Sequence, residues 1–346
     1  MALKQNMSDW AADLINSKER AAIPIMTHPG IEMIGKHVID AVTDGTTHFE
    51  AIKAIASQYP TSAATIIMDL TVESEAFGCR INFGEHEVPS VMERLVHDFE
   101  TVSNLKIPDM NSGRIQEYLK ASRLAAENIA DRPVFGGCIG PFSLAGRLFD
   151  MTEIMTAAII EPETITLLLE KCTKLLLQYV LEMKKTGVNG IIIAEPAAGL
   201  LDETLCEEFS SKYVKLIVDA TQDENFMVVL HNCGNTGHLT QSMVNTGAAG
   251  LHFGNRIDML KVLQEVPSNI LVMGNLDPVG VFKMSDAGQI KTITSNLLKA
   301  TREYSNFVIS SGCDTPPGVS QANVDAFFEA VNDFNYNNIT SKQLTY

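Results

Sequence analysis

The strongest constraint on the fold is a series of eight short apolar runs, most of them followed by a stretch with helical spacing. The runs are rich in Val, Ile, Leu and Met and do not alternate with charges, which is typical of strands buried on both faces of a parallel sheet. They occupy residues 23–28, 63–69, 134–140, 190–195, 226–233, 247–254, 269–275 and 307–313. Strand and helix alternating eight times predict an α/β fold, a closed (β/α)8 TIM barrel.

A doubly wound open sheet is the alternative to the barrel. Its nucleotide-binding forms carry a Gly-x-Gly-x-x-Gly or a phosphate loop after a strand. The first run is followed by no such glycine pattern, and the chain contains no phosphate-loop motif. A length of 346 residues also suits one barrel with additions. The barrel is therefore the preferred prediction, with residues 1–346 forming a single domain.

Three segments do not fit the simple alternation. Residues 1–22 precede the first run and are expected to form a helical arm that covers the floor of the barrel. Residues 70–132 are too long for one crossover helix, so they predict an insertion over the barrel, with a hairpin at residues 79–89 that acts as a lid. Residues 335–346 are polar and are expected to form a frayed tail.

Polar side chains stand at or just past the carboxyl ends of nearly all the runs. They are His28, Asp69, Ser143, Glu195, His231 with Cys233, His252, Asn275 with Asp277, and Cys313 with Asp314. In β/α barrels the active site is built at that end of the strands. A full ring of polar strand ends is hard to explain by packing alone, so the sequence predicts a functional rim there.

One imidazole and two sulfurs stand out on this rim. His231 and Cys233 are two residues apart at the end of one run, so they would face the same side of a strand. Cys313 ends another run. Two thiolates and an imidazole suit zinc, and three protein ligands leave one position open for chemistry. We therefore predict one catalytic Zn²⁺ per chain, held by these three residues.

The remaining cysteines and the overall charge limit the other possibilities. Cys79, Cys138, Cys172 and Cys206 are expected to be core residues, because free cysteine is usually buried. A formal net charge of −16 argues against nucleic acid or an anionic membrane as a partner. The first 20 residues lack a secretory signal pattern, and no run is as long as a membrane helix. These features predict a cytoplasmic protein with free thiols.

Five segments carry a resemblance to a known family. They are DLTVESEAFG at 69–78, GPFSLAG at 140–146, EPAA at 195–198, GNLDP at 274–278 and GCDTPPG at 312–318. Together they resemble the uroporphyrinogen decarboxylase superfamily, which also contains the zinc-dependent methylcobalamin:thiol methyltransferases. The resemblance spans nearly the whole chain and implies a distorted β/α barrel.

The resemblance favours the methyltransferase branch. In that branch a His-x-Cys and a later Cys hold zinc, and this sequence has the pattern at His231, Cys233 and Cys313. The decarboxylases lack it and carry arginines after the first strand, where residues 25–32 read IMTHPGIE. Asp69 does match the decarboxylases' important aspartate. Tetrapyrrole decarboxylation therefore stays an alternative, as does a non-catalytic barrel that binds a corrinoid or tetrapyrrole.

The resemblance implies zinc-dependent transfer of a methyl group from methylcobalamin or a corrinoid protein to a small thiol, such as coenzyme M or homocysteine. The expected partner is therefore a corrinoid protein. Asp69 and Glu195 are the expected catalytic residues, with Glu195 as first and Asp314 as second candidate for a fourth zinc ligand. The residues expected to contact the corrinoid are His28, His252 and Asn275.

Two further pairs of charged residues are assigned from their places in the sequence. Arg147 and Arg256 lie near predicted strand ends and are candidates to bind an acidic group on the acceptor. Glu73 and Glu75 are expected to lie in a solvated turn after the second run.

Overall fold

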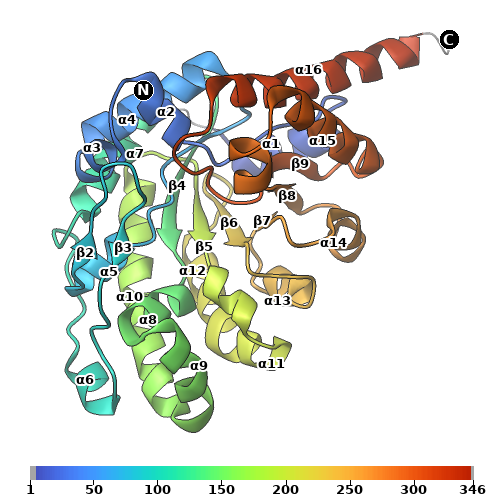
Figure 1. The fold of residues 1–346 in the computed structure, drawn as a ribbon. Coiled ribbons are helices and arrows are strands. Elements are labelled where there is room, and N and C mark those ends of the chain that lie inside the picture. The colour runs from blue at the N-terminus through green and yellow to red at the C-terminus, as the bar shows by residue number, and fades with distance from the viewer. Residues whose placement is uncertain (1–4, 344–346) are drawn as a thin grey trace.

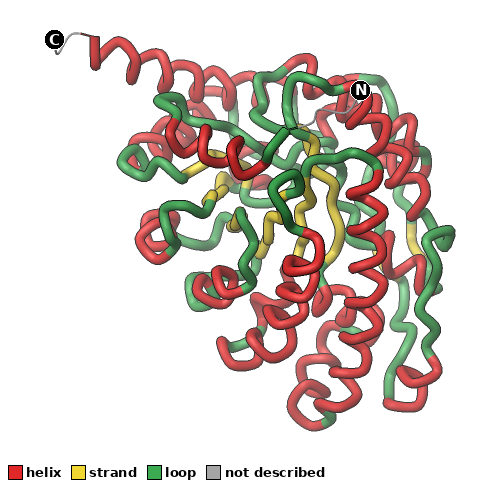
Figure 2. The backbone as a smooth tube through the Cα atoms, turned by 180° about the vertical axis from the view of Figure 1, so that it is seen from behind, coloured by secondary structure: helices red, strands yellow, loops and turns green. Residues whose placement is uncertain are grey.

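Seven strands form one parallel sheet in the computed structural model, which describes residues 5–343. The sheet curls into a half-barrel with helices around its outer face (Figures 1 and 2). Its strands follow one another in chain order: β1 (Ala64–Thr65), β4 (Val134–Ile139), β5 (Gly190–Ala194), β6 (Met227–Asn232), β7 (Gly250–Phe253), β8 (Leu271–Leu276) and β9 (Phe307–Ser311). The α/β class and the parallel sheet agree with the sequence prediction.

The helices occupy most of the intervals between the strands. They are α1 (Met7–Asn16), α2 (His28–Met33), α3 (Val38–Thr43), α4 (Gly45–Gln58), α5 (Val72–Phe77), α6 (Phe99–Asn104), α7 (Ile115–Asn128), α8 (Pro141–Phe149), α9 (Met151–Ile160), α10 (Pro162–Lys185), η1 (Pro196–Leu200), α11 (Glu203–Cys206), η2 (Glu207–Ser211), α12 (Lys212–Thr221), α13 (Thr240–Asn245), α14 (Met259–Glu265), η3 (Pro278–Lys283), α15 (Ala287–Ala300) and α16 (Gln321–Gln343). No helix in the described part of the chain is long and apolar enough to cross a membrane.

The first apolar run, residues 23–28, is not a regular strand, so the prediction of eight strands was wrong. Ala22, just before it, forms an isolated parallel bridge with Ile309 of β9. Ser62 N, just before β1, donates to Ala22 O at 2.8 Å. The stretch therefore lies between the two edge strands and makes the half-barrel TIM-barrel-like. Pro24 has no N–H, which prevents a continuous ladder of hydrogen bonds.

Strand β1 is short because side chains capture its next backbone donors. Ile67 N donates to His48 Nε2 at 3.0 Å, and Met68 N donates to Asp314 Oδ2 at 3.2 Å. Burial lowers the pKa of His48 to about 3, so its imidazole is neutral and has a nitrogen lone pair to offer. The run at 63–69 thus leaves the strand ladder after Ile66, whose N–H still donates to Phe135 O at 3.3 Å, and passes Asp314 on the way to the rim.

Helix α1 packs against the amino-terminal end of the half-barrel. Trp10 is 6% exposed, and its ring centroid lies 5.9 Å from that of Phe135 on β4. These two residues belong to an apolar cluster that fills the interior of the sheet; its other members are Met7, Ile23, Ile25, Ala63, Ile192, Met227, Val229, Leu271, Met273 and Val308. Burying each large side chain of this kind contributes about 1.5–3 kcal/mol. The interior below the rim is therefore a packed floor.

The interval at 70–132, predicted as an insertion with a lid-like hairpin, also contains a helix of the barrel pattern. Strands β2 (Ile81–Asn82) and β3 (Ser90–Val91) pair antiparallel, which confirms a hairpin in this region. Helix α7 packs against α4 and β4, so it is the crossover helix that links β1 to β4. Only the part of the interval before α7 is an excursion from the barrel pattern.

The prediction of a frayed tail at 335–346 was wrong up to Gln343. Helix α16 begins at Gln321, buries Val324 and Phe327, and packs against α15. No Gly or Pro occurs between residues 335 and 343, so the helix continues after its buried face ends. Residues 344–346 lie outside the described part of the chain.

Candidate metal centre

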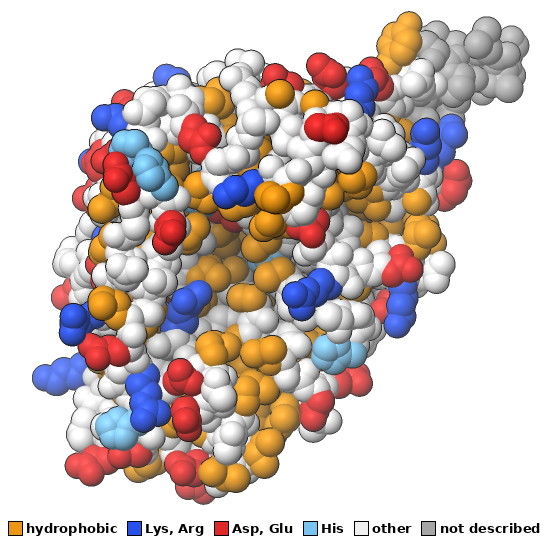
Figure 3. All heavy atoms as spheres, in the orientation of Figure 1, with side chains coloured by type: hydrophobic (Ala, Val, Ile, Leu, Met, Phe, Trp, Pro, Cys, Tyr) orange, Lys and Arg blue, Asp and Glu red, His pale blue; other side chains and the backbone are white. Residues whose placement is uncertain are grey.

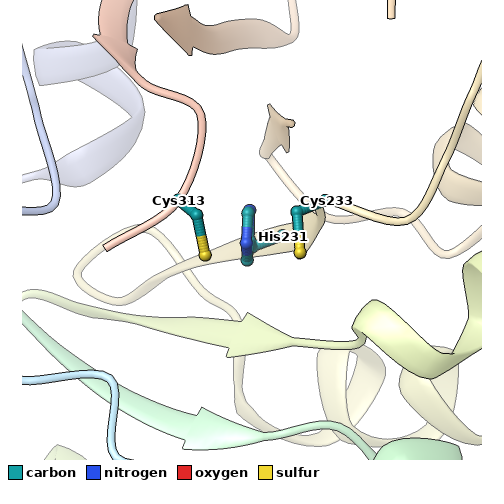
Figure 4. A group of neighbouring side chains, drawn as sticks. All are labelled: His231, Cys233 and Cys313. Carbon is teal, nitrogen blue, oxygen red and sulfur yellow. The ribbon is translucent and has the colours of Figure 1, made fainter. Parts of the chain in front are cut away.

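The structure brings the three predicted ligands together at the carboxyl ends of β6 and β9. His231 lies on β6, Cys233 follows its last residue, and Cys313 comes two residues after β9. One possible ligand atom from each residue lies within 4.8 Å of the other two. Figure 4 shows His231 between the two cysteines, with the three side chains pointing the same way. A single ion can therefore reach all three.

Glycines at the ends of two strands make this approach possible. A Cβ atom on Gly254, after β7, would lie 2.6 Å from Cys233 Cα and Cys233 O. A Cβ atom on Gly312, after β9, would lie 2.7 Å from Asn255 N. Glycine marks places where another backbone comes very close. The cysteine-bearing segments meet because neither position carries a side chain.

The atoms of the trio suit a soft cation. Cys233 and Cys313 are half-buried, and a hydrogen bond between their thiols lowers the pKa of Cys233 and raises the pKa of Cys313. His231 is 2% exposed, and its Nε2 atom is buried without a hydrogen-bond partner among the described residues. A buried polar atom without a partner is unusual. Two sulfurs and this imidazole nitrogen fit zinc, with a further position left for a ligand.

His252 lies behind His231, away from the cysteines. The two histidines face each other in register on β7 and β6, and their Nδ1 atoms are 2.7 Å apart. His252 Nε2 lies 2.8 Å from Ser310 Oγ, which donates to Ile23 O at 2.7 Å. Burial lowers the pKa of His252 well below its usual value, so this ring is neutral. His252 was expected to contact a corrinoid; in the structure its ring is 0% exposed and contacts a candidate metal ligand.

Glu195 does not join the trio. Its carboxylate accepts hydrogen bonds from Phe142 N at 2.7 Å, Ser143 N at 2.9 Å and Ser210 Oγ at 3.0 Å. The two amides belong to the first turn of α8, where a carboxylate is stabilised by the helix dipole. Burial raises the pKa of Glu195, and these hydrogen bonds oppose that shift. In this structure the side chain caps α8.

Asp314 and His28 pair with each other beside the trio. Asp314 Oδ1 lies 3.4 Å from His28 Nδ1, while its other oxygen accepts from Met68 N. Burial lowers the pKa of His28, but Asp314, a hydrogen bond with the Thr315 backbone and the charge of Asp69 together outweigh it, so the net pKa is raised. Neither Asp314 nor Glu195 belongs to the group of possible metal ligands around Cys313 in the described residues.

Asn275, also expected at a corrinoid site, supports the turn that follows β7. Its Nδ2 atom donates to Gly254 O at 3.0 Å and to Ile257 O at 2.8 Å. Because Gly254 lies against Cys233, Asn275 acts on the trio only through the backbone.

Asp69 is held in a charge network that the sequence did not reveal. Its carboxylate accepts hydrogen bonds from Arg114 at 2.5 Å, Tyr118 OH at 3.0 Å, and the amide and hydroxyl of Thr71 at 2.9 and 2.6 Å. Arg114 also donates to Glu75 at 2.6 Å, so the expectation that Glu75 lies in a solvated turn was wrong. Arg114 and Tyr118 are 45 and 49 residues from Asp69, and no local pattern links them.

Glu73 was also expected to be solvated, and it is buried at 1% exposure. Its Oε1 atom accepts from Ile139 N at 3.1 Å, whereas Oε2 has no hydrogen-bond partner among the described residues. Burial raises the pKa of this carboxyl to about 8, so it is largely protonated at neutral pH. Cys79, Cys138, Cys172 and Cys206 are buried, as predicted.

The two candidate arginines differ in their surroundings. Arg147 is half-buried on α8, and burial lowers its pKa. Arg256 is exposed after β7, and its charge helps to lower the pKa of Cys233.

Figure 3 shows a central hollow on one face of the molecule, with hydrophobic side chains on its walls and Lys or Arg side chains at its margin. A further group of possible ligands, His37, Glu85 and His86, is exposed at the surface.

Residues 20–334 match the family model described as "Uroporphyrinogen decarboxylase (URO-D)". The chain belongs to this family. The match covers the half-barrel and the candidate metal centre, in agreement with the resemblance seen in the sequence.

Relatives within the family carry two different names. The chain is 30% identical to "Methylcobamide:CoM methyltransferase MtbA" of Methanosarcina acetivorans, over 79% of this chain and 80% of the relative. It is 25% identical to "Uroporphyrinogen decarboxylase" of Legionella pneumophila, over 80% of each chain. A solved "methyltransferase from Methanosarcina mazei" superposes with a TM-score of 0.84 and 22% identity, covering 96% of this chain and 99% of the other. That structural likeness shows the shared fold.

Proposed function

We propose that the protein transfers a methyl group from a methylated corrinoid to a small thiol, using one Zn²⁺ held by His231, Cys233 and Cys313. The observation that carries the proposal is the meeting of these three ligand atoms within 4.8 Å at the rim of the half-barrel. The unpartnered Nε2 atom of His231 supports a metal role for this group. The higher identity to a methylcobamide:CoM methyltransferase than to the decarboxylases points to the same reaction.

Zinc at this site would supply a thiolate at neutral pH, because a free thiol with a pKa of about 8.5 is mostly protonated and a poor nucleophile. In the transfer, the cobalt–carbon bond breaks with its electron pair left on cobalt, and a carbon–sulfur bond forms. The protein's part is to hold the acceptor sulfur in line with the methyl group and to exclude water. The packed floor beneath the rim provides the dry side of that site.

The proposed acceptor is a small thiol with an acidic group, such as coenzyme M; homocysteine is the second candidate. Arg256 is the residue we propose for recognition of that group, because it is exposed after β7, two residues past Gly254, which lies against Cys233. Arg147 is half-buried on α8 and is the second choice. The methyl donor is a corrinoid protein or free methylcobalamin, and its docking face would be the side of the molecule in Figure 3.

Metal content and methyl transfer test the proposal together. We expect about one zinc per purified chain, and formation of methylated thiol when methylcobalamin and coenzyme M or homocysteine are supplied. Cys233→Ser should lose both metal and transfer. Cys206→Ser is the matched control, since Cys206 is a buried thiol beside Ser211 Oγ at 3.7 Å and outside the trio. Full transfer by a metal-free wild-type protein would overturn the proposal.

The structure gives less support to tetrapyrrole decarboxylation. That reaction would depend on Asp69, whose carboxylate is occupied by Arg114, Tyr118 and Thr71. Incubation with uroporphyrinogen should therefore give no loss of carboxyl groups. A non-catalytic barrel is the third outcome, and binding of methylcobalamin without turnover in the presence of zinc and thiols would establish it.

A further inference from the structure

Three buried hydrogen bonds run in line from His231 to the irregular stretch before β1. They join His231 Nδ1 to His252 Nδ1 at 2.7 Å, His252 Nε2 to Ser310 Oγ at 2.8 Å, and Ser310 Oγ to Ile23 O at 2.7 Å. His252 and Ser310 are both 0% exposed, and His231 is 2% exposed. Water therefore offers these groups no alternative partner.

The last acceptor in the line determines which atom donates and which accepts in each of the three hydrogen bonds. Ile23 O is a carbonyl and can only accept, so Ser310 must give it its single hydroxyl proton. Ser310 Oγ then has only lone pairs for His252, so His252 Nε2 must carry a proton. A neutral imidazole has one N–H, which leaves His252 Nδ1 as an acceptor. His231 Nδ1 must then donate, and the lone pair of His231 is on Nε2.

The reverse order fails at one contact. If His252 Nδ1 donated to His231, its Nε2 atom would become an acceptor and Ser310 would have to donate to it. Ser310 Oγ and Ile23 O would then meet at 2.7 Å with lone pairs only. An unsatisfied buried polar pair of this kind costs about 1–3 kcal/mol. The forward order is therefore the stable one.

We propose that His252 and Ser310 are positioning residues, which hold His231 in the Nδ1–H tautomer and so present its Nε2 lone pair to the metal. Metal-ligating histidines usually donate their other N–H to a carboxylate, a carbonyl or water. Here the acceptor is a second, neutral imidazole. Its consequence for metal binding rests on the proposed function, but the tautomer itself is a property of the metal-free protein.

The same line ties the metal centre to the part of the half-barrel that lacks a regular strand. Ile23 belongs to the stretch between β1 and β9, and Ile23 N donates to Ile309 O at 3.0 Å. The position of this stretch between β1 and β9 therefore places Ile23 O as the final acceptor in the line. A neutral chain of this kind also adds no negative charge behind His231.

Nitrogen NMR of the metal-free protein with labelled histidine tests the tautomer. The His231 signals, assigned by their loss in His231→Gln, should show a proton on Nδ1 and none on Nε2. In Ser310→Ala, His252 loses the Ser310 hydroxyl as an acceptor and keeps only the backbone of Ser311, so the fraction of His231 with a proton on Nε2 should rise. Ser311→Ala is the matched control: Ser311 is also 0% exposed on β9, and its Oγ atom contacts Ile25 N at 3.0 Å and Ile25 O at 3.3 Å.

Zinc affinity, measured by competition with a chelator, tests the consequence. Ser310→Ala and His252→Phe should bind zinc about 10–100-fold more weakly than wild type, the range found when such supporting residues are removed. Ser311→Ala should stay within about threefold, because its hydroxyl reaches no imidazole. His252→Gln keeps one acceptor and one donor and should recover part of the loss.

The outcomes separate this inference from the proposed function. Equal zinc affinity and an unchanged His231 tautomer in Ser310→Ala and Ser311→Ala would overturn the inference. A wild-type protein that binds no zinc, but whose His231 tautomer responds to Ser310→Ala, would support the inference and overturn the proposed function. Circular dichroism of each variant confirms that the compared proteins are folded.

Discussion

Two polar regions at the same rim of the half-barrel differ in how well their atoms are paired. Around Asp69, each carboxylate oxygen accepts a hydrogen bond from Arg114, Tyr118 or Thr71. Around Cys233, the thiols contact each other, and His231 Nε2 has no hydrogen bond of normal geometry among the described residues and only the weakly interacting Cys313 thiol near the ring. Buried polar groups are normally paired, so the unpaired set is the better candidate for an external ligand. The Asp69 region is a fully paired network.

The largest effect should come from breaking the paired region. Arg114→Leu leaves the Asp69 carboxylate, which is 0% exposed in its side chain, without its cation. Removing one partner of a buried ion pair costs about 3–5 kcal/mol. We expect that loss in the free energy of unfolding by urea, with zinc binding retained wherever the variant is folded.

Arg80→Leu is the control for that substitution. Arg80 pairs with Glu93 at 3.4 Å, and both side chains are mostly exposed. Removing an exposed arginine of this kind should change the free energy of unfolding by less than about 0.5 kcal/mol. Similar losses in the two variants would contradict the distinction between a buried network and a surface pair.

A smaller effect on stability, but a clear one on metal, should come from Gly254→Ala at the unpaired region. The added methyl would lie 2.6 Å from Cys233 Cα, so the backbone that carries this cysteine must move. Overpacking of this kind costs about 1–3 kcal/mol. Chelator competition should show weaker zinc binding than in wild type. Unchanged zinc affinity would show that the position of Cys233 is not set by this contact.

The smallest effect concerns Glu73, whose Oε2 atom has no hydrogen-bond partner among the described residues, unlike the carboxylate oxygens of nearby Asp69. Its pKa is raised from 4.5 to about 8 by burial, so the folded state keeps a proton that the unfolded state loses above about pH 4.5. Stability should therefore fall as the pH rises from about 5 to 8. Glu73→Gln stays neutral and can still accept from Ile139 N.

Urea unfolding of both proteins at pH 5 and pH 8 measures this difference. Between pH 5 and pH 8, the free energy of unfolding of Glu73→Gln should rise relative to that of wild type by at least about 1 kcal/mol. This lower limit is less than the free energy that corresponds to a shift of one pKa unit. Parallel pH dependences would mean that Glu73 finds a partner in solution.

Seven of the eight apolar runs contain strands, because buried parallel strands have a composition that local sequence can show. The first run is the exception, and its cause is local, because Pro24 within it has no N–H. The strand in the second run is short because distant side chains, His48 and Asp314, take its next amide donors. The tail after Asn335 is helical because α16 is already anchored by Phe327. Local polarity could not reveal that anchoring.

The trio was predictable because two of its members share a strand face and the third ends another run. The surroundings of Glu195 and His252 were not. Glu195 points to the first turn of α8, and His252 faces His231 across a strand pair whose register the sequence alone does not define. Residues at strand ends were thus correctly placed on one rim, while their partners depended on tertiary contacts.

Helix α1 and the apolar layer above it close the interior of the half-barrel at its amino-terminal end. Trp10 and Phe135 fill that end with packed side chains, whereas Cys313 lies after β9 at the opposite, rim end. A bulky methyl donor bound at the rim would cover a small acceptor that has already bound, or would prevent a later acceptor from binding. For the transfer proposed here, we therefore expect the thiol to bind before the corrinoid donor and the methylated product to leave after it.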